Sequence, residues 1–175
     1  LSNHLALDLI LKDRTSKDKE IIGLWVYDIE KEIVETFPTD AIILATGGGG
    51  QLFSRTTNPS VATADGMAMA NRAGAKLIDM EFVQFHPTSA ALDSDRPFLI
   101  SEAVRGYGGI LMTTSEYNLW KHHNSSKKPE DYSFTRKYSD LGSLATRDIL
   151  ARAIDQELNF SGEEHVLLIT EHLDQ

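Results

Sequence analysis

The sequence predicts a mixed fold with α/β and α+β parts, and three observations support it. The first is the uninterrupted apolar run in DAIILATGGGG (residues 40–50), which is typical of a strand buried on both faces of a parallel sheet. The second is a pair of strand-like runs, Ile21–Asp28 and Glu32–Phe37, whose short connection predicts a hairpin. The third is Thr146–Leu158, where apolar residues recur at helical spacing.

The remaining elements of the first half follow from local patterns. Leu5–Leu11 is short and apolar, and the charged stretch Lys12–Glu20 after it is predicted to be a loop. Ala62–Ala73 is rich in helix formers, and Gly74 is placed to end that helix. The alternating residues Lys76–Phe85 predict a strand or an extended segment.

The second half is less regular. Asn118–Lys137 has no sustained period and is rich in Asn, Ser and Lys, so we expect an exposed loop. Ser143 is the expected cap of the helix that follows. His165–Thr170 (HVLLIT) predicts one more strand.

Composition excludes several classes of function. The chain has 175 residues and a formal net charge of −9, whereas a nucleic-acid surface needs clustered Lys and Arg. Cysteine is absent, which excludes disulfides and fits the cytoplasm. No apolar run approaches the roughly 18 residues that cross a bilayer, so no membrane association is expected. The first residue is Leu1, which indicates an internal piece of a longer protein.

Two glycine-containing stretches are candidates for contact with a cofactor. Ala45–Gly50 (ATGGGG) follows the expected buried strand, and glycines there let the backbone approach a bulky group. Thr56–Ser60 (TTNPS) and Ala64–Gly66 (ADG) lead into a helix N-terminus, which suits anionic groups. The dinucleotide fingerprint G-x-G-x-x-G is absent because position 52 is Leu. From the residues alone, ATGGGG is equally compatible with a simple turn, whereas for TTNPS a turn followed by a helix cap at Ser60 is the favoured explanation.

Polar groups also cluster in SEAVRG (residues 101–106). Ser101 and Arg105 are four residues apart and share a helix face, from which Glu102 is expected to project away. From the residues alone, a solvated surface helix is the default explanation of this pattern.

Arg147 and His86 have the same ambiguity. Arg147 stands at the start of a helix, against the dipole, where an arginine often grips a carboxylate instead. His86, between a phenylalanine and a proline, is by itself more typical of a structural histidine. No set of His, Asp and Glu at ligand spacing accompanies the histidines, so no metal site is predicted.

The order of these motifs is more specific than any one of them. ATGG, TTNP, DGMAMANRAGA, EFVQFHPT, SEAVRG and LATRDILARAID, between Ala41 and Leu158, closely resemble the L-aspartate oxidase family of flavoproteins. That family lies within the superfamily of fumarate reductase and succinate dehydrogenase flavoprotein subunits, and TTNP favours the oxidases. The alternatives are a fragment of a reductase or dehydrogenase subunit, or a non-catalytic module that has lost the cofactor. Tyr107, where relatives usually have Glu, favours the last.

The resemblance implies FAD as cofactor, in a Rossmann-like domain with an inserted capping domain. Residues 1–80 would be part of the FAD-binding domain, and residues 81–175 part of the cap. The implied reaction is oxidation of L-aspartate to iminoaspartate, with hydride passing from Cα to FAD and reoxidation by oxygen or fumarate. It would serve de novo NAD biosynthesis, with a possible hand-off to quinolinate synthase.

Roles are carried over by motif matching. Arg147 would be catalytic, through substrate orientation or the bolder role of proton transfer. The substrate-binding residues would be His86, Gln84, Ser101, Glu102 and Thr88. The cofactor-binding residues would be Ala45, Thr46, Gly47, Gly48, Asn58 and Asp65. Because the fingerprint is absent, we expect the 175-residue chain alone to bind FAD weakly or not at all and to be inactive.

Overall fold

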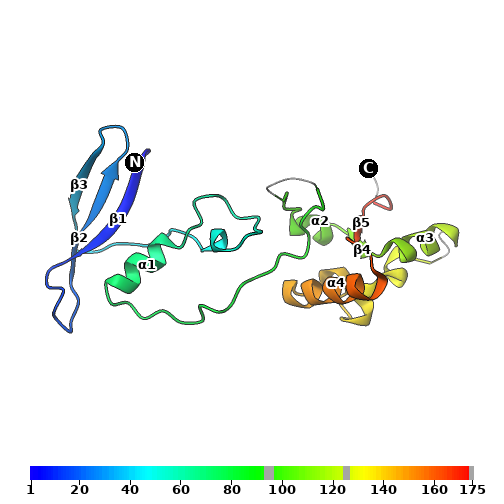
Figure 1. Ribbon diagram of the computed structural model, residues 1–175. Helices are drawn as coiled ribbons and strands as arrows, with labels where there is room; N and C mark the ends of the chain where they lie inside the picture. Colours follow the sequence, from blue (N-terminus) through cyan, green and yellow to red (C-terminus); the bar gives the residue numbers. More distant parts are fainter. Residues whose placement is uncertain (93–96, 124–126, 174–175) are drawn as a thin grey trace. The chain divides into compact units, whose positions relative to one another are not determined.

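The computed structural model describes residues 1–92, 97–123 and 127–173. It divides into two compact units, Leu1–Glu81 and Phe82–Gln175, which are described separately (Figure 1). Strands and helices occur together with two small sheets, which confirms the mixed α/β class.

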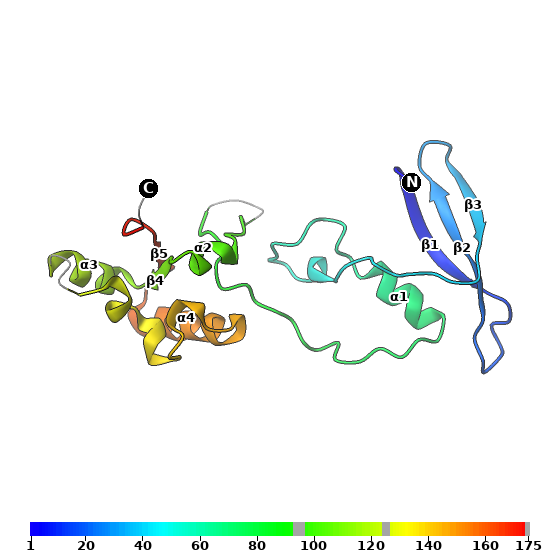
Figure 2. The ribbon, with the colours of Figure 1, turned by 180° about the vertical axis from the view of Figure 1, so that it is seen from behind.

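The first unit is built on a three-stranded antiparallel sheet in the order β1-β2-β3 (Figure 2). The strands are β1 (His4–Leu11), β2 (Ile21–Asp28) and β3 (Ile33–Pro38). The predicted hairpin is therefore confirmed, with Leu24 opposite Phe37. The short apolar run at the start of the chain forms β1, which pairs with β2 to complete the sheet. Leu9 of this strand is buried.

Helix α1 (Asp65–Arg72) follows in the same unit and begins three residues after the predicted start at Ala62. Its N-cap, Ala64, has left-handed backbone angles (φ 66°, ψ 18°), which break the helix at this point. Gly74 ends the helix as predicted, at φ 91° with its N–H donated to the carbonyl of Asn71 at 2.9 Å. Arg72, the last residue of α1, donates from Nε to Oδ2 of Asp8 in β1 at 3.1 Å.

The predicted strand within residues 40–50 is wrong. The described structure has no strand there, only the short 3₁₀ helix η1 (Gly50–Leu52), and Ile43 is 94% exposed. An interior strand exists only when neighbouring strands take its backbone hydrogen bonds, and no described strand pairs with this run. Lys76–Phe85, predicted to be a strand or an extended segment, forms no strand.

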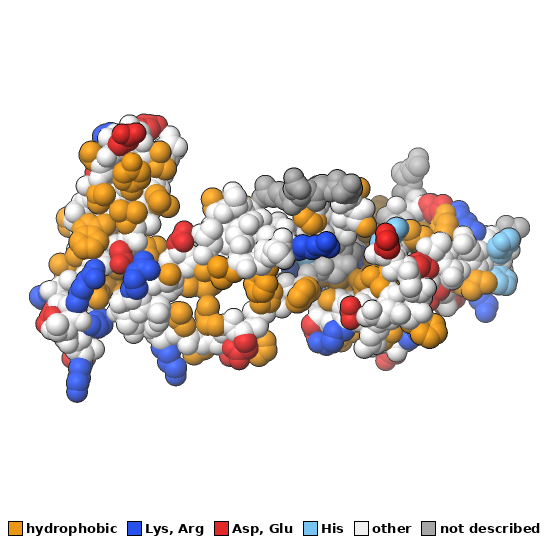
Figure 3. All heavy atoms as spheres, viewed as in Figure 1, with side chains coloured by type: hydrophobic (Ala, Val, Ile, Leu, Met, Phe, Trp, Pro, Cys, Tyr) orange, Lys and Arg blue, Asp and Glu red, His pale blue; other side chains and the backbone are white. Residues whose placement is uncertain are grey.

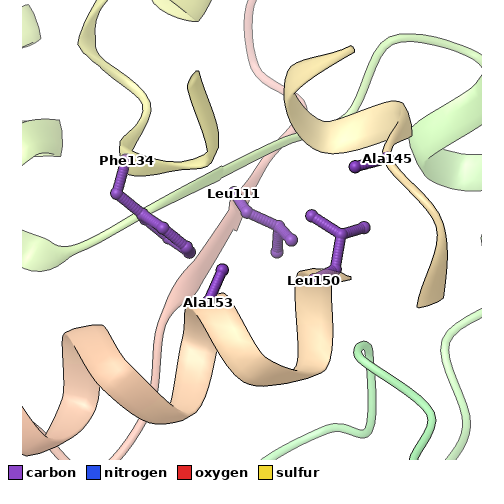
Figure 4. Packing of buried hydrophobic residues seen from close by; sticks show 5 residues of the cluster. All are labelled: Leu111, Phe134, Ala145, Leu150 and Ala153. Atoms are coloured by element: carbon purple, nitrogen blue, oxygen red, sulfur yellow. The ribbon is translucent and has the colours of Figure 1, made fainter. Parts of the chain in front are cut away.

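The second unit has its core between one helix and a two-stranded antiparallel sheet. The helix is α4 (Arg147–Ser161), and the strands are β4 (Ile110–Met112) and β5 (Leu167–Ile169). Figure 4 shows how Leu150 and Ala153 of α4 point toward Leu111 of β4 and Phe134, with exposures of 1% or less. The predicted helix and the predicted last strand are both confirmed.

The predicted exposed loop at Asn118–Lys137 is wrong in its described part. Helix α3 (Thr114–His122) begins with a capping box, in which the side chain of Thr113 accepts from the N–H of Glu116 and the Glu116 carboxylate accepts from the N–H of Thr113. Two 3₁₀ helices follow, η2 (Pro129–Tyr132) and η3 (Phe134–Lys137). Phe134 and Trp120 are buried, so this segment supplies core residues despite its polar composition.

Two short helices complete the second unit, α2 (Glu102–Gly106) and η4 (Gly142–Leu144). The predicted cap role of Ser143 is wrong, because Thr146 is the residue that precedes α4. Ser143 Oγ instead accepts a hydrogen bond from Leu111 N at 3.0 Å, which joins η4 to β4. Within the described ranges, no helix combines the length and the apolar character that crossing a membrane requires.

Candidate functional site

A pair of oppositely charged residues in the second unit joins α2 to α4. Arg147 Nε donates to Glu102 Oε2 at 2.7 Å, and Arg147 Nη2 lies 2.6 Å from the same oxygen. Glu102 is the first residue of α2 and Arg147 the first residue of α4, so two helix starts meet here. The hydrogen bonds from Arg147 lower the pKa of Glu102. Glu102 is therefore held as a carboxylate.

Gln84 completes the support of this arginine. Its Oε1 accepts from Arg147 Nη1 at 3.0 Å. All three guanidinium nitrogens thus have a protein partner, while one N–H on each Nη is left over from the five that an arginine carries. Arg147 is 42% exposed, so those two N–H groups can reach a ligand from an already oriented fork. The structure brings together three residues that the motifs had separated by up to 63 positions.

Arg105 is the residue that the sequence prediction left out of the site. Its side chain is 1% exposed, and Nη1 donates to the carbonyl of Ser143 at 2.7 Å. Nη2 of Arg105 lies 3.9 Å from Oε1 of Glu102, which is three residues earlier on the same helix. The expectation that Glu102 projects away from Arg105 is therefore wrong, because residues three apart on a helix are neighbours. The spacing of three residues between Glu102 and Arg105 was the signal in the sequence that could have identified Arg105 as part of the site.

His86 is held by Thr88, its neighbour in the motif. The N–H of Thr88 donates to His86 Nδ1 at 3.2 Å, while the Thr88 hydroxyl donates to the carbonyl of Ile100 at 3.1 Å. An Nδ1 that accepts a hydrogen bond places the ring proton on Nε2 in the neutral imidazole. Burial, and then the positive charges of Arg147 and Arg105, lower the pKa of His86. The geometry therefore favours a neutral ring that offers one Nε2–H donor.

Ser101 has a structural task in addition to any role in binding. It is the N-cap of α2, and its Oγ accepts from the N–H of Ala103 at 3.2 Å. Because the oxygen is the acceptor in this bond, the hydroxyl hydrogen remains free to be donated. Together, these groups offer several donors and two guanidinium charges against the single carboxylate of Glu102, which suits a carboxylate ligand.

The predicted cofactor-binding residues lie together in the first unit. A Cβ placed on Gly66 would lie only 1.9 Å from Thr46 Oγ1, so the ATGG stretch packs directly against the start of α1. The N–H of Ala64 also donates to the carbonyl of Gly48 at 3.3 Å. Ala45 belongs to the same stretch and is exposed.

Asn58, from the TTNPS stretch, lies against the end of the ATGGGG stretch. A Cβ on Gly50 would lie 2.5 Å from Cγ of Asn58, and Gln51 Nε2 donates to the carbonyl of Asn58 at 2.9 Å. Asp65 is the first residue of α1, and its Oδ2 accepts from Thr63 Oγ1 at 2.8 Å.

The residues present fit a flavin nucleotide. A Cβ built on Gly47 or Gly48 would meet no atom within 4 Å, so the bare backbone of both faces open space beside the start of α1. Gly47 has φ 73°, a conformation that exposes amide groups and favours glycine. A bulky anionic group can therefore approach the backbone here.

One polar cluster in the first unit has side chains of the kind that bind metal ions, although the sequence predicts no metal site. His4, Asp28 and Glu35 bring one ligand atom each to within 4.8 Å of one another across the three strands of the first sheet. Lys31 Nζ already lies 2.8 Å from Asp28 Oδ2 and 3.1 Å from Glu35 Oε1. The ammonium group supplies the positive charge that these carboxylates need.

Comparison with known proteins places these motifs in one family. The family described as FAD binding domain matches residues 1–175. L-aspartate oxidase of Yersinia pestis is 38% identical over 95% of this chain, and L-aspartate oxidase 2-a of Nicotiana tabacum is 42% identical over 97%. A structure of E. coli quinol fumarate reductase superposes with a TM-score of 0.70 at 27% identity over 98% of this chain.

The matched region is a small part of each relative. The chain spans 29% of the Yersinia protein, 25% of the Nicotiana protein and 28% of the reductase chain. The match of the family model nevertheless extends over every residue, including both units. This chain therefore belongs to the FAD binding domain family.

Proposed function

We propose that the protein containing this chain is an FAD-dependent oxidase of L-aspartate. The observation that carries the proposal is Arg147, fixed by Glu102 and Gln84, in a chain similar to proteins named L-aspartate oxidase. The product would be iminoaspartate, in the de novo biosynthesis of NAD. FAD, when bound, supplies the acceptor for the hydride that leaves the substrate Cα.

The cofactor would be held in the first unit. The backbone of Gly47 and Gly48 leaves room for it, and Ala45 and Thr46 lie in the same stretch, against the start of α1. Asn58 and Asp65 complete the proposed contacts. In this reading residues 1–80 are part of the FAD-binding domain and residues 81–175 part of the cap.

The substrate would be held in the second unit by groups at its two ends. His86 would donate Nε2–H to one carboxylate, with Thr88 fixing the ring, and the two spare N–H groups of Arg147 would bind at the reacting end. Ser101 would add its hydroxyl hydrogen. Such fixation of Cα is a proximity effect, worth several orders of magnitude when the bound geometry is close to the reactive one.

Arg147 would act first through its charge. A guanidinium resists deprotonation, so substrate orientation and charge stabilisation are the primary roles of Arg147. Glu102 would keep the fork in the correct plane. Proton transfer by Arg147 is the bolder form of the same proposal.

The test is an Arg147→Lys variant of the full-length gene product that contains this chain. Lysine keeps the charge but loses the planar fork, so kcat for L-aspartate is expected to fall on the order of 100-fold while the flavin absorption band is retained. Arg152→Lys is the matched control, because Arg152 lies on the same helix and pairs only with exposed Asp148 among the described residues. Near-normal turnover in the Arg147→Lys variant would contradict both proposed roles.

Substrate choice decides between this proposal and its alternatives. Assays with L-aspartate, succinate and fumarate separate an aspartate oxidase from a reductase or dehydrogenase, to which the similarity with quinol fumarate reductase also points. A full-length protein without a flavin band would instead be the non-catalytic module. Reoxidation by oxygen or fumarate, a hand-off to quinolinate synthase and a cytoplasmic location remain parts of the proposal for separate tests.

A further inference from the structure

The cluster of His4, Asp28 and Glu35 in the first unit takes no part in the proposed flavin and substrate sites. The three residues stand on β1, β2 and β3, one on each strand. His4 is directly opposite Asp28. Glu35 is opposite Val26, two residues before Asp28 on β2. Because side chains alternate between the faces of a sheet, all three share one face.

The ring of His4 is oriented as in a metal ligand. Its Nδ1 is hydrogen-bonded to the carbonyl oxygen of Ser2, which can only accept. Nδ1 therefore carries the proton, and Nε2 of the neutral ring has a free lone pair. Nε2 lies 3.7 Å from Oδ2 of Asp28, so two acceptors face each other with no hydrogen between them. Histidines that bind a metal through one ring nitrogen almost always donate the other N–H in this way.

The carboxylate of Asp28 is also held in place by its surroundings. Its side chain is 4% exposed, and Oδ1 accepts hydrogen bonds from the N–H groups of Glu30 and Lys31 at 3.0 and 3.1 Å. Oδ2 is left to face His4 and the ammonium group of Lys31. Ligating carboxylates in metal sites are oriented by such outer hydrogen bonds.

The ammonium group of Lys31 marks the position where a cation is needed. Nζ lies 2.8 Å from Oδ2 of Asp28 and 3.1 Å from Oε1 of Glu35. The side chain of Lys31 is nevertheless 61% exposed, and its four-carbon stem is flexible. It can therefore turn out into solvent and leave this position open to another cation. Lys31 competes with a metal ion but does not exclude it.

We propose that His4, Asp28 and Glu35 bind a zinc ion that joins the three strands of the first sheet. A tetrahedral ion with bonds of about 2.1 Å places its ligand atoms about 3.4 Å apart. The ligand atoms here all lie within 4.8 Å of one another, and those of His4 and Asp28 are already at 3.7 Å. Water takes the fourth position.

The chemistry of the ligands selects the ion. Two carboxylates and a neutral imidazole balance the charge of one divalent ion, and the ammonium group of Lys31 is released. An imidazole among only three protein ligands favours zinc over calcium, which takes six to eight oxygens, and over magnesium, which prefers oxygens and water. The ion ties β1 and β3, the two edge strands, to β2. This role does not depend on the identity of the oxidised substrate.

The experiment is equilibrium dialysis of Zn²⁺ against the full-length gene product, after a chelator has removed bound metal. His4→Ala removes the nitrogen ligand and should raise the Kd of one zinc ion about 100-fold or more, because even the outer partners of a ligand are worth about 10- to 100-fold. Glu35→Gln, on an edge strand, should also raise it. His122→Ala is the matched control, since this exposed histidine of α3 is not part of the cluster. It should leave the Kd unchanged.

Lys31→Met distinguishes a metal site from a cluster that the ammonium group alone completes. The variant keeps an unbranched side chain but removes the competing charge, so the Kd for zinc should fall about fivefold. An unchanged or higher Kd in this variant would overturn the proposal.

Hydrogen exchange shows where the ion binds. Zinc should slow the exchange of the amide hydrogens of β1 and β3 in the wild type, but not in His4→Ala. No measurable zinc binding would overturn the proposal. Equal binding by the wild type and His4→Ala would mean a site elsewhere in the protein and would overturn it as well. None of these measurements requires turnover, so they stay informative even if no L-aspartate oxidation is found.

Discussion

Replacing Gly66 by alanine should destabilise the protein, although the same exchange normally stabilises a helix. Gly66 is the second residue of α1, where alanine gains about 1 kcal/mol in helix propensity. The new Cβ, however, would lie 1.9 Å from Thr46 Oγ1, 2.8 Å from Thr46 Cβ and 2.9 Å from Thr46 Cγ2. Rotation of the threonine side chain moves Oγ1 and Cγ2 but leaves Cβ in place. The backbone must therefore shift.

The size of the effect follows from these two opposing terms. Overpacking of this kind costs about 1–3 kcal/mol, and the fixed Cβ contact favours the upper half of that range. After the gain in helix propensity, the free energy of unfolding should fall by about 1–2 kcal/mol. In a Thr46→Gly background the obstructing side chain is absent, and Gly66→Ala should become stabilising by up to about 1 kcal/mol.

Urea unfolding of the four proteins in this double-mutant cycle measures both numbers. The coupling energy between positions 46 and 66 should be about 2–3 kcal/mol, within the range seen for residues in contact. A Gly66→Ala variant that is more stable than the wild type would refute the close approach of ATGG to α1. The same conclusion would follow if Gly66→Ala had equal effects in both backgrounds.

Three further predictions concern single residues. Ala64→Gly should stabilise by about 0.5–1 kcal/mol in urea unfolding, because the left-handed backbone at φ 66° strains alanine more than the added freedom of glycine costs; a loss of stability would contradict it. The lowered pKa of His86 means that the unfolded chain takes up this proton first, so stability should decline as the pH falls below about 6.5, and less so in His86→Gln. Hydrogen bonds from Lys31 lower the pKa of Asp28 to about 2 from 3.8, so its contribution is present above pH 3.8 and lost toward pH 2. Asp28→Asn should remove that part of the acid transition, and an unchanged transition would argue against the contact.

Prediction from sequence succeeded where the pattern is local. The stripe of Leu150 and Ala153 in α4 follows from helical periodicity, and both residues are in the core. It failed for Ile43, since an apolar run becomes a strand only when other strands pair with it. It also failed for α3, where the capping box of Thr113 and Glu116 was present in the sequence but no apolar period accompanied it.

The candidate site was also predicted only in part. Motif order selected Glu102 and Arg147, and the structure joins them at 2.7 Å across 45 positions. The burial of Arg105 could not be read from SEAVRG, because it depends on the backbone of Ser143, 38 positions away. Long-range packing turned an apparent surface arginine into a buried one.

The exposed run at Ala41–Leu44 has a consequence for how the chain behaves among its own copies. Figure 3 shows apolar side chains over much of the visible surface of the first unit, and Ile43 is almost wholly exposed. An extended apolar segment with unpaired backbone groups is a template on which another chain can add a strand. The same apolar residues that would be buried in the middle of a sheet thus favour association with another chain when they are exposed. The 175-residue chain by itself is therefore prone to associate into intermolecular sheets as its concentration rises.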